Sequence, residues 1–375
     1  MIFYVTYNDL PSGIFSSQVI DTVKFLNAEL NGNVKLISFI SFRNFFTNRR
    51  KIIIEKSDAL VLPMFPGFHR FRFNVFLLLI VTLIFRPNCI IGRSVLATHL
   101  GFLLRKIKMV KTVIYDGRGA IEAEWKEYKV VANCILLSTI RDLEKSAVLN
   151  SDFRISVSYA LVDYWKVNFN YNKQEHVIIP CTLNKVFENV LINAQSIQIS
   201  RDQIGVNKDD ILFVYSGSVA GWQSFNLLYE FMKKILKVDL DVKLLFLSEE
   251  DSIITKLKKE FKEQIICRKV NANEVPEFLL AADYGLLIRE ESTTNLVASP
   301  VKFAEYLACG LQVIISDKLG DYSKFVIDKN CGYLFSQFIN PHKIDIYSKN
   351  KNSDLALGFF TKKYFIKEYI KVLNS

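Results

Sequence analysis

The sequence has few of the residues that build disulfide frameworks and metal sites. Its six cysteines lie far apart, without a C-x-x-C pair, and mostly inside apolar runs. Its four histidines, His69, His99, His176 and His342, are scattered, and none joins cysteines or carboxylates in a group of three or four ligands. We therefore expect neither a disulfide-stabilised fold nor a bound metal, and a reducing cytosol fits the cysteines best.

Several short catalytic signatures are also missing. The chain contains no G-x-S-x-G, H-E-x-x-H, G-x-x-x-x-G-K-[ST] or G-x-G-x-x-G. These absences argue against hydrolase, metalloprotease, kinase and dehydrogenase functions. Met1 leads directly into the strand-like IFYVTY, without a basic n-region or a small-residue cleavage site. We therefore expect no signal peptide and a cytoplasmic protein.

Positive charge is concentrated in the first half of the chain. The formal net charge is +10, and residues 1–180 contain 23 Lys and Arg against 14 Asp and Glu, a difference of +9. Much of this charge surrounds the apolar run VFLLLIVTLIF at 75–85, which is shorter than the roughly 20 residues that span a bilayer. The run predicts either a core helix or a surface that lies against anionic lipid. No stacking motif accompanies the charge, so we expect no nucleic-acid partner.

Strand-like apolar runs alternate with helical or polar stretches in two series along the chain, which is typical of parallel α/β sheets. With 375 residues, half of them apolar, the chain is long enough for two such cores. We predict two doubly wound Rossmann-like domains, 1–183 and 184–355, and a final helix within 356–375. In the first series we expect a helix from about residue 17 to 30 and a strand-like run at 131–137.

The segment from Ser299 to Gly310, SPVKFAEYLACG, has the signals of a short capped helix. Ser299 suits the N-cap, Pro300 the first helical position and Gly310 the residue after the end. Lys302 and Glu305 are three residues apart and so project side by side. A helix N-terminus with a nearby cation favours a phosphate, and a carboxylate can accept two ribose hydroxyls. A packed helix with a solvated Lys–Glu bridge would show the same spacing.

Ligands of doubly wound sheets bind outside the carboxyl ends of the strands, which singles out the turns that follow them. In the second domain, Ser216-Gly217-Ser218 offers small residues and N–H groups to a phosphate, and Arg289 follows a later strand. An ordinary βα turn would look like the first of these.

Three turns of the first domain are singled out by the same rule: NDLPSG at 8–13, GRS at 92–94 and DGRG at 116–119. Asp116 and Arg118, in DGRG, gather an acid and a base where the strand-like TVIY ends, and they are candidates for contact with a transferred group or an acceptor. A structural ion pair would look the same. Gly13, in PSGIFSS, would let the backbone approach phosphates, with a helix starting near Ser16.

Four stretches resemble the retaining, metal-independent sugar transferases of GT-B family 4. They are LLIREESTTNLVASPVKFAEYLACGLQVIIS, VYSGSVAGWQSF at 214–225, VIIPCTLNKVFE at 177–188 and, more loosely, YVTYNDLPSGIFSSQV at 4–19. The resemblance implies the α/β GT-B fold, in which two doubly wound domains face each other across a cleft and the C-terminal helix packs back on the first.

The resemblance also implies a function. It is transfer of a hexosyl unit from a nucleotide-sugar to a glycan or lipid-linked acceptor, with retention, in bacterial capsule or lipopolysaccharide synthesis. No cofactor or metal is needed. Such a protein would be cytoplasmic, or peripheral on the inner face of the cytoplasmic membrane. The basic charge around the run at 75–85, rather than the resemblance, indicates an anionic membrane surface as a further partner of the first domain.

Two family positions differ in this chain. Glu305 matches the second Glu of the family's E-x(7)-E pair and would hold the ribose, but Val297 stands at the first. Asn295, or the carboxylates at 290 and 291, would then contact the sugar. The family's lysine after the first turn is replaced by Trp222-Gln223, so Arg289 and Lys302 would take over the diphosphate. Ser299 belongs to the same donor segment, and Trp222 would stack on a sugar or base unless it is a core residue.

Two other functions fit the same observations. A nucleotide-sugar 2-epimerase would share the two sheets and a similar donor pocket, but would need no acceptor. A non-catalytic protein that binds membranes or nucleic acid would explain the basic first half, and its binding would depend steeply on salt.

Overall fold

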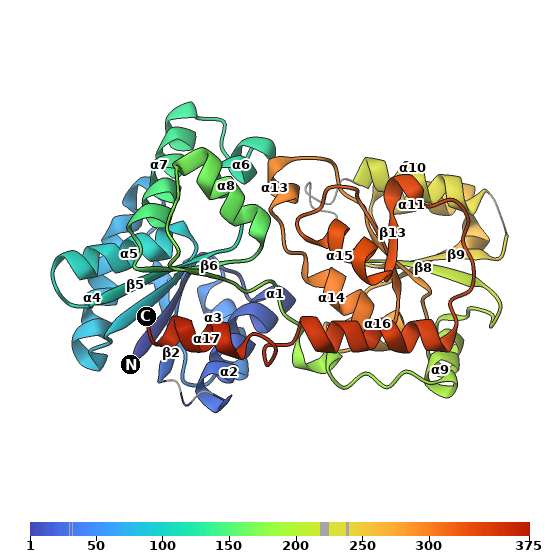
Figure 1. The fold of residues 1–375 in the computed structure, drawn as a ribbon, viewed down its shortest axis with the longest axis horizontal. Coiled ribbons are helices and arrows are strands. Elements are labelled where there is room, and N and C mark those ends of the chain that lie inside the picture. The colour runs from blue at the N-terminus through green and yellow to red at the C-terminus, as the bar shows by residue number, and fades with distance from the viewer. Residues whose placement is uncertain (30, 32, 218–224, 238–239) are drawn as a thin grey trace. The chain divides into compact units, whose positions relative to one another are not determined.

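A computed structural model describes residues 1–375 except residues 30, 32, 218–224 and 238–239 (Figure 1). The chain forms two compact units. The first unit contains Met1–Asn184, Val297–Ser299 and Lys362–Ser375, and the second contains Lys185–Leu296 and Pro300–Thr361. The sequence prediction placed the divisions at 183/184 and 355/356.

The first unit is built on a seven-stranded parallel sheet with the order β3-β2-β1-β4-β5-β6-β7. Its strands are β1 Ile2–Tyr7, β2 Val34–Ser41, β3 Leu60–Met64, β4 Cys89–Arg93, β5 Thr112–Gly117, β6 Phe153–Ser156 and β7 His176–Ile178. Strand β1 lies inside the sheet and pairs Ile2 with Val34 of β2 and with Cys89 of β4. Because both faces of the sheet are covered, these strands are mostly apolar.

Helices cover both faces of this sheet (Figure 1). They are α1 Gly13–Phe15, the π-helical η1 Ser16–Ile20, α2 Asp21–Glu29, α3 Phe45–Glu55, the 3₁₀-helical η2 Phe68–Phe73, α4 Asn74–Phe85, α5 Val95–Lys106, α6 Ile121–Glu127, α7 Cys134–Asn150, α8 Tyr159–Phe169 and α17 Ile366–Leu373. Alternate residues of β1 enter two cores. Phe3 and Val5 join the core under α4, α5, α7 and α8, and Tyr4 joins the core under α2, α3 and α17.

Two expectations for the first unit were wrong. The apolar run 131–137 is not a strand, since the helix α7 begins at Cys134 behind an N-cap at Asn133, whose side chain accepts the Ile135 N–H. The first helix begins at Gly13 rather than near Ser16, because the Ser12 side chain caps it by accepting the Phe15 N–H. Both caps are Ser or Asn residues just before the helix, as N-cap preferences require.

The second unit repeats the same winding with six parallel strands in the order β10-β9-β8-β11-β12-β13. Its strands are β8 Ile211–Ser216, β9 Val242–Leu247, β10 Ile265–Arg268, β11 Tyr284–Leu287, β12 Gln312–Ile315 and β13 Gly332–Leu334. The predicted class, two doubly wound Rossmann-like α/β domains, is therefore confirmed. The crossovers place helices on both faces of this sheet too.

The helical elements of the second unit are η3 Lys185–Phe187, α9 Ala194–Ile204, α10 Phe225–Leu236, α11 Ser252–Glu260, η5 Lys262–Gln264, α12 Val275–Leu280, α13 Thr293–Leu296, α14 Val301–Ala308, α15 Tyr322–Lys329, η6 Phe335–Gln337 and α16 Ile346–Phe359. Helix α16 escaped the sequence analysis because its buried face is largely polar. Lys349, Asn352, Ser353 and Ala356 have helical spacing and are all buried. Ser353 Oγ donates to the Ala308 carbonyl at 3.0 Å, which docks α16 against α14.

The segment predicted from Ser299 to Gly310 forms helix α14, but its beginning differs from the prediction. The N-cap position is Pro300, which makes no side-chain cap. Ser299 belongs to the first unit, where its Oγ accepts the Cys181 N–H at 2.8 Å. The end agrees with the prediction, since Gly310 has a φ of 80°, a conformation that favours glycine after a helix.

Helix α14 lies unusually close to strand β11 because residue 285 is a glycine. A Cβ built on Gly285 would lie 2.4 Å from Cδ2 of Tyr306, so the tyrosine ring rests on the bare backbone of the strand. A glycine within a strand marks such close approaches. This contact fixes the height of α14 above the sheet, and with it the positions of Lys302 and Glu305.

We predict that Gly285→Ala lowers the free energy of unfolding by about 1–3 kcal/mol, because the added methyl group overpacks the Tyr306 contact. The control is Gly358→Ala in α16, where a Cβ would meet nothing within 4 Å and the change should be within about 1 kcal/mol of neutral. Urea unfolding of the two variants measures both effects. Equal stabilities would contradict the proposed close packing.

Candidate active site

The second sheet has its switch point between β8 and β11. The chain winds outward from β8 through β9 to β10 and then returns to the other side of β8 as β11. Crevices outside the carboxyl ends of such strand pairs are where doubly wound sheets bind ligands. Ser216 ends β8, and Arg289 stands two residues after the end of β11. Two predicted donor-site positions therefore lie at this switch point.

Tyr306 attaches helix α14 to the end of β8. Its hydroxyl oxygen accepts the Ser216 N–H at 3.0 Å and donates to the Leu286 carbonyl at 3.4 Å, and the side chain is fully buried. Lys302 is one helical turn before Tyr306 on the same face of α14. Its side chain therefore extends over the end of β8, near Ser216. The sequence analysis did not identify Tyr306, although Gly285 within a strand-like run was a signal of a close approach.

Lys302 places a buried ammonium group against the Ser216–Gly217 turn. Its Nζ lies 4.9 Å from the centre of the Tyr215 ring and so close to Gly217 that a Cβ there would stand 2.0 Å away. Gly217 has a φ of 135°, which also favours glycine. Within the described part of the chain, Nζ has no hydrogen-bond partner. A buried cation without an anion is costly, so the arrangement is suited to one supplied by a ligand.

Arg289 brings a second positive charge to the same place. Its backbone N–H donates to Ser316 Oγ at 2.6 Å, and its Nη1 donates to Asn295 Oδ1 at 3.4 Å. Its charge contributes to the lowered pKa of Lys302, which shows that the two cations are near each other. Asn295 is 2% exposed and also donates to the Glu290 carbonyl at 3.0 Å. In this structure the amide therefore orients Arg289.

Burial opposes the charged forms of both polar side chains on α14. It lowers the pKa of Lys302 to about 7, with a further decrease caused by Arg289 and a smaller increase caused by Glu305. It raises the pKa of Glu305 to about 7, and the Lys302 charge only partly offsets this increase. Perturbed groups in a cleft are characteristic of functional sites. The alternative of a fully solvated Lys–Glu bridge does not describe this pair, and no direct ion pair joins them among the described residues.

The other predicted donor residues have different outcomes. Ser218 and Trp222 lie outside the described residues. Gly13 is exposed at the start of α1 in the first unit. The carboxylates at 290 and 291 are exposed, and Glu291 pairs with Lys318 at 2.7 Å. No group of three or more His, Cys, Asp or Glu in the described part of the chain gathers where a metal ion could be held.

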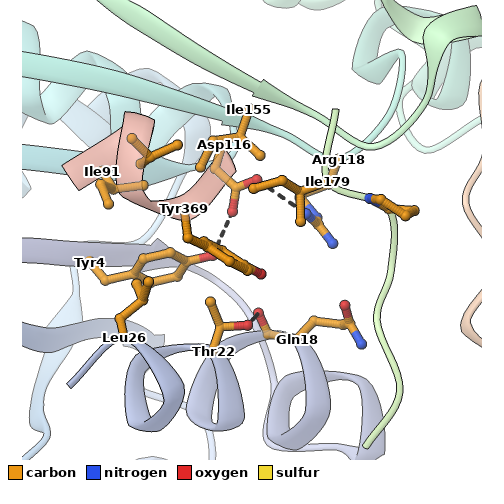
Figure 2. A pocket seen from close by; sticks show the side chains of 12 residues that line it. Tyr4, Gln18, Thr22, Leu26, Ile91, Asp116, Arg118, Ile155, Ile179 and Tyr369 are labelled. Carbon is orange, nitrogen blue, oxygen red and sulfur yellow. Dashed lines mark hydrogen bonds and ion pairs between the residues drawn. The ribbon is translucent and has the colours of Figure 1, made fainter. Parts of the chain in front are cut away.

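In the first unit, Asp116 is the centre of a buried ion network (Figure 2). The Tyr4 hydroxyl donates to Asp116 Oδ2 at 2.5 Å, and Arg118 Nη1 lies 3.2 Å from Oδ1. Arg93 Nη1 lies 3.5 Å from Oδ2. Asp9 pairs with Arg93 Nε at 3.4 Å. Burial, followed by the Asp116 charge, raises the pKa of Tyr4, so the phenol stays a donor.

The geometry favours the structural alternative for Asp116. The residue is 1% exposed and both carboxylate oxygens are engaged. Asp116 lines a small cavity together with Tyr4, Gln18 and Tyr369. The volume in which the centre of a water molecule can move there is only about 10 Å³. That space holds one water molecule and excludes a sugar. A contact with a transferred sugar therefore stays a prediction for Arg118 but is disfavoured for Asp116.

The sequence analysis placed Arg118 beside Asp116 but did not identify Tyr4 and Arg93 as further partners of this network. Arg93 ends β4, and its side chain is 9% exposed. Arg118 also donates from Nη2 to Cys181 Sγ at 3.4 Å. The basic side chain in the GRS turn at the end of a strand was the available signal for Arg93, whereas nothing in the sequence indicates that Tyr4, in the middle of a strand, would bind Asp116.

The family of glycosyl transferases group 1 matches residues 196–346, which include α14, the Ser216–Gly217 turn and Arg289. The chain has the GT-B fold. This match covers less than half of the chain, so it shows that the second unit is similar to glycosyl transferases group 1. Family 4 is a finer assignment that rests on the motifs alone.

Three solved structures illustrate the GT-B likeness. A glycosyltransferase from Rickettsia africae has a TM-score of 0.73 at 13% identity, covering 100% of this chain and 97% of its own. Anabaena Alr3699/HepE, solved in complex with UDP, has a TM-score of 0.72 at 12% identity, covering 100% and 99%. WaaG, a glycosyltransferase involved in lipopolysaccharide biosynthesis, has a TM-score of 0.55 at 12% identity, covering 99% and 98%.

At these identities the likeness shows the GT-B fold alone. No curated protein matches the sequence.

We predict that Lys302→Met stabilises the unliganded protein, because it removes a buried ammonium that has no anionic partner among the described residues. The folded-state pKa of about 7 lies below the ordinary 10.5, so wild-type stability should rise between pH 7 and 10.5 as the folded protein loses this proton first. The advantage of the variant should be largest below pH 7 and shrink above it. Urea unfolding from pH 6 to 9 measures the difference.

The control for this measurement is Lys324→Met, which removes an exposed lysine from α15. A difference between Lys302→Met and wild type that is the same at every pH, or matched by the control, would contradict the buried charge.

Proposed function

We propose that the protein is a glycosyltransferase that moves a hexosyl unit from a nucleotide-sugar to a glycan or lipid-linked acceptor. The observation that carries this proposal is the buried Lys302 ammonium against the Ser216–Gly217 turn, beside Arg289, at the switch point of the second sheet. A buried ammonium that has no hydrogen-bond partner among the described residues, with a guanidinium beside it, suits a diphosphate. The match of this segment to glycosyl transferases group 1 supports the same reaction class.

In this proposal the reaction is driven by stabilisation of the leaving group. The bond between the anomeric carbon and the diphosphate oxygen breaks, and its electron pair departs with the diphosphate, where Lys302 and Arg289 stabilise the added charge. The acceptor oxygen forms the new bond to the anomeric carbon and passes its proton to the departing diphosphate oxygen. The Gly217 backbone lets the phosphates approach closely, because no Cβ intervenes.

Glu305 is proposed to bind the ribose of the donor. It follows Lys302 by three residues on α14, so the two side chains would contact neighbouring parts of one nucleotide. A carboxylate accepts hydrogen bonds from two vicinal hydroxyls, and each such bond to a charged group contributes about 1.5–3 kcal/mol. The raised pKa of Glu305 would fall when the hydroxyls bind, since they stabilise the charged form.

The first test is thermal stabilisation by UDP, GDP, ADP and CMP. One diphosphate at about 100 times its dissociation constant should stabilise the protein by roughly 2.7 kcal/mol, a shift of a few degrees. Glu305→Gln and Lys302→Met should each weaken binding by about tenfold or more. The matched control, Glu277→Gln at an exposed position of α12, should bind as wild type does.

Either of two outcomes would sink the donor site: no nucleotide stabilises the protein, or the Glu277→Gln control loses as much affinity as Glu305→Gln. Stabilisation by a nucleotide-sugar that is converted into its 2-epimer without an acceptor would replace transfer by the epimerase function.

The bacterial surface polysaccharide role and the retaining outcome are further parts of the proposal. They are supported by the motif resemblance and by the fold shared with WaaG. We expect the anomeric proton of the product to have the donor's configuration in NMR spectra taken before mutarotation. An inverted anomeric centre would contradict family 4 chemistry while leaving glycosyl transfer intact. A cytoplasmic location is also proposed, because six free cysteines suit a reducing compartment.

A further inference from the structure

Helix α4 exposes an apolar face on the outside of the first unit. Five large apolar side chains are more than half exposed on it or directly before it: Phe73 at 53%, Phe76 at 60%, Ile80 at 56%, Leu83 at 55% and Ile84 at 68%. They are spaced by three or four residues, apart from the adjacent last pair, and so form one continuous stripe. Soluble proteins seldom leave so many large apolar side chains together in water.

The opposite face of α4 is part of the core, which fixes the helix on the sheet. Leu78 and Val81 are buried there, and Asn74 is fully buried. Asn74 Nδ2 donates to the Tyr7 hydroxyl at 2.9 Å and to the Phe71 carbonyl at 2.8 Å, while its Oδ1 accepts the Phe65 N–H at 2.8 Å. Helix α4 also belongs to the crossover between β3 and β4, which are not neighbours in the sheet.

Because one face of α4 is attached to the sheet, the helix can lie on a membrane but cannot span it. Residues Phe68–Phe85 are apolar and long enough to cross a membrane by length and composition, and 28% of them are buried. Helix α4 itself has 12 residues and measures roughly 18 Å, whereas the hydrocarbon layer is about 30 Å thick. Because one face is buried in the sheet core, the helix offers only its outer face to lipid.

The charge around the stripe identifies the kind of surface that it fits. Residues 59–115 contain no Asp or Glu, although they contain eight Lys and Arg. Arg70 and Arg72 precede α4, and Arg86 is its C-cap residue; all three side chains are exposed. Lys35 Nζ stands 4.7 Å from the centre of the Phe85 ring near the same end. A second copy of this chain would bring a like-charged surface, whereas an anionic bilayer supplies both an apolar layer and negative charge.

We propose that the outer face of α4 docks the protein on an anionic lipid bilayer. The helix lies in the interface, with the stripe from Phe73 to Ile84 in the acyl boundary and Arg70, Arg72 and Arg86 on the headgroup phosphates. This goes beyond the proposed transfer reaction and does not depend on it, because neither the surface nor its test involves a nucleotide.

The test is flotation of the full chain with vesicles of phosphatidylcholine and of an equimolar mixture with phosphatidylglycerol. Wild-type protein should float with the mixed vesicles, less so at high salt, and only weakly with the neutral ones. The double variant Ile80→Glu/Leu83→Glu should lower partitioning by at least about tenfold, because it places two carboxylates in the interface. Arg72→Gln should lower it by roughly fivefold.

A matched double variant controls for added negative charge. Ile54→Glu/Val167→Glu carries the same two carboxylates at positions of α3 and α8 that are 73% and 80% exposed, and it should float as wild type does. Circular dichroism and thermal melting establish that every variant is folded.

Three results would overturn the proposal: no flotation with either vesicle, equal flotation with neutral and anionic vesicles, or equal losses in the two double variants. A concentration-dependent dimer that Ile80→Glu/Leu83→Glu dissociates, in a protein that does not float, would instead assign the stripe to a second copy of the chain.

Discussion

The candidate donor site depends on one close contact between a helix and a strand. Gly285 has no side chain, so the Tyr306 ring can rest on β11 while its hydroxyl accepts the Ser216 N–H. This single side chain joins α14 to the carboxyl ends of the two strands at the switch point. Lys302 and Glu305 lie within one turn of it, so the directions of both functional groups follow from a packing interaction in which neither takes part.

The strands of the two units wind in the same order, but the buried charges of the units differ in whether the protein itself supplies a partner. In the first sheet, Asp116 near the end of β5 is surrounded by Tyr4, Arg93 and Arg118, and its charge is balanced inside the protein. At the switch point of the second sheet, two cations lie together and the ammonium of Lys302 has no hydrogen-bond partner among the described residues. A cluster whose charges are paired stabilises the fold. A buried charge without a partner lowers the stability of the unliganded protein, and an anionic ligand can reverse this loss. Fold topology alone would not distinguish the two sites.

Much of the fold could be predicted because the strands, such as Val242–Leu247 and Ile265–Arg268, are short apolar runs bounded by turns. Helix α16 could not, since polar side chains occupy the buried spacing that apolar residues usually mark. In the site, helix signals located Lys302 and Glu305, because spacing along one element determines which side chains are neighbours. Tyr4 and Arg93 were missed because they meet Asp116 from other strands, and such contacts have no signature in any single segment.

The division of the chain has a consequence for its biosynthesis. The core of the first unit includes Tyr369 and Val372 of α17, which pack with Tyr4 and the helices near the N-terminus. A ribosome that has completed residue 361 has made every residue of the second unit, while the first unit still lacks one side of its core. The unit that is translated first is therefore the one that finishes folding last, and until then the apolar surface beneath α17 must be kept from aggregating by chaperones or by transient structure.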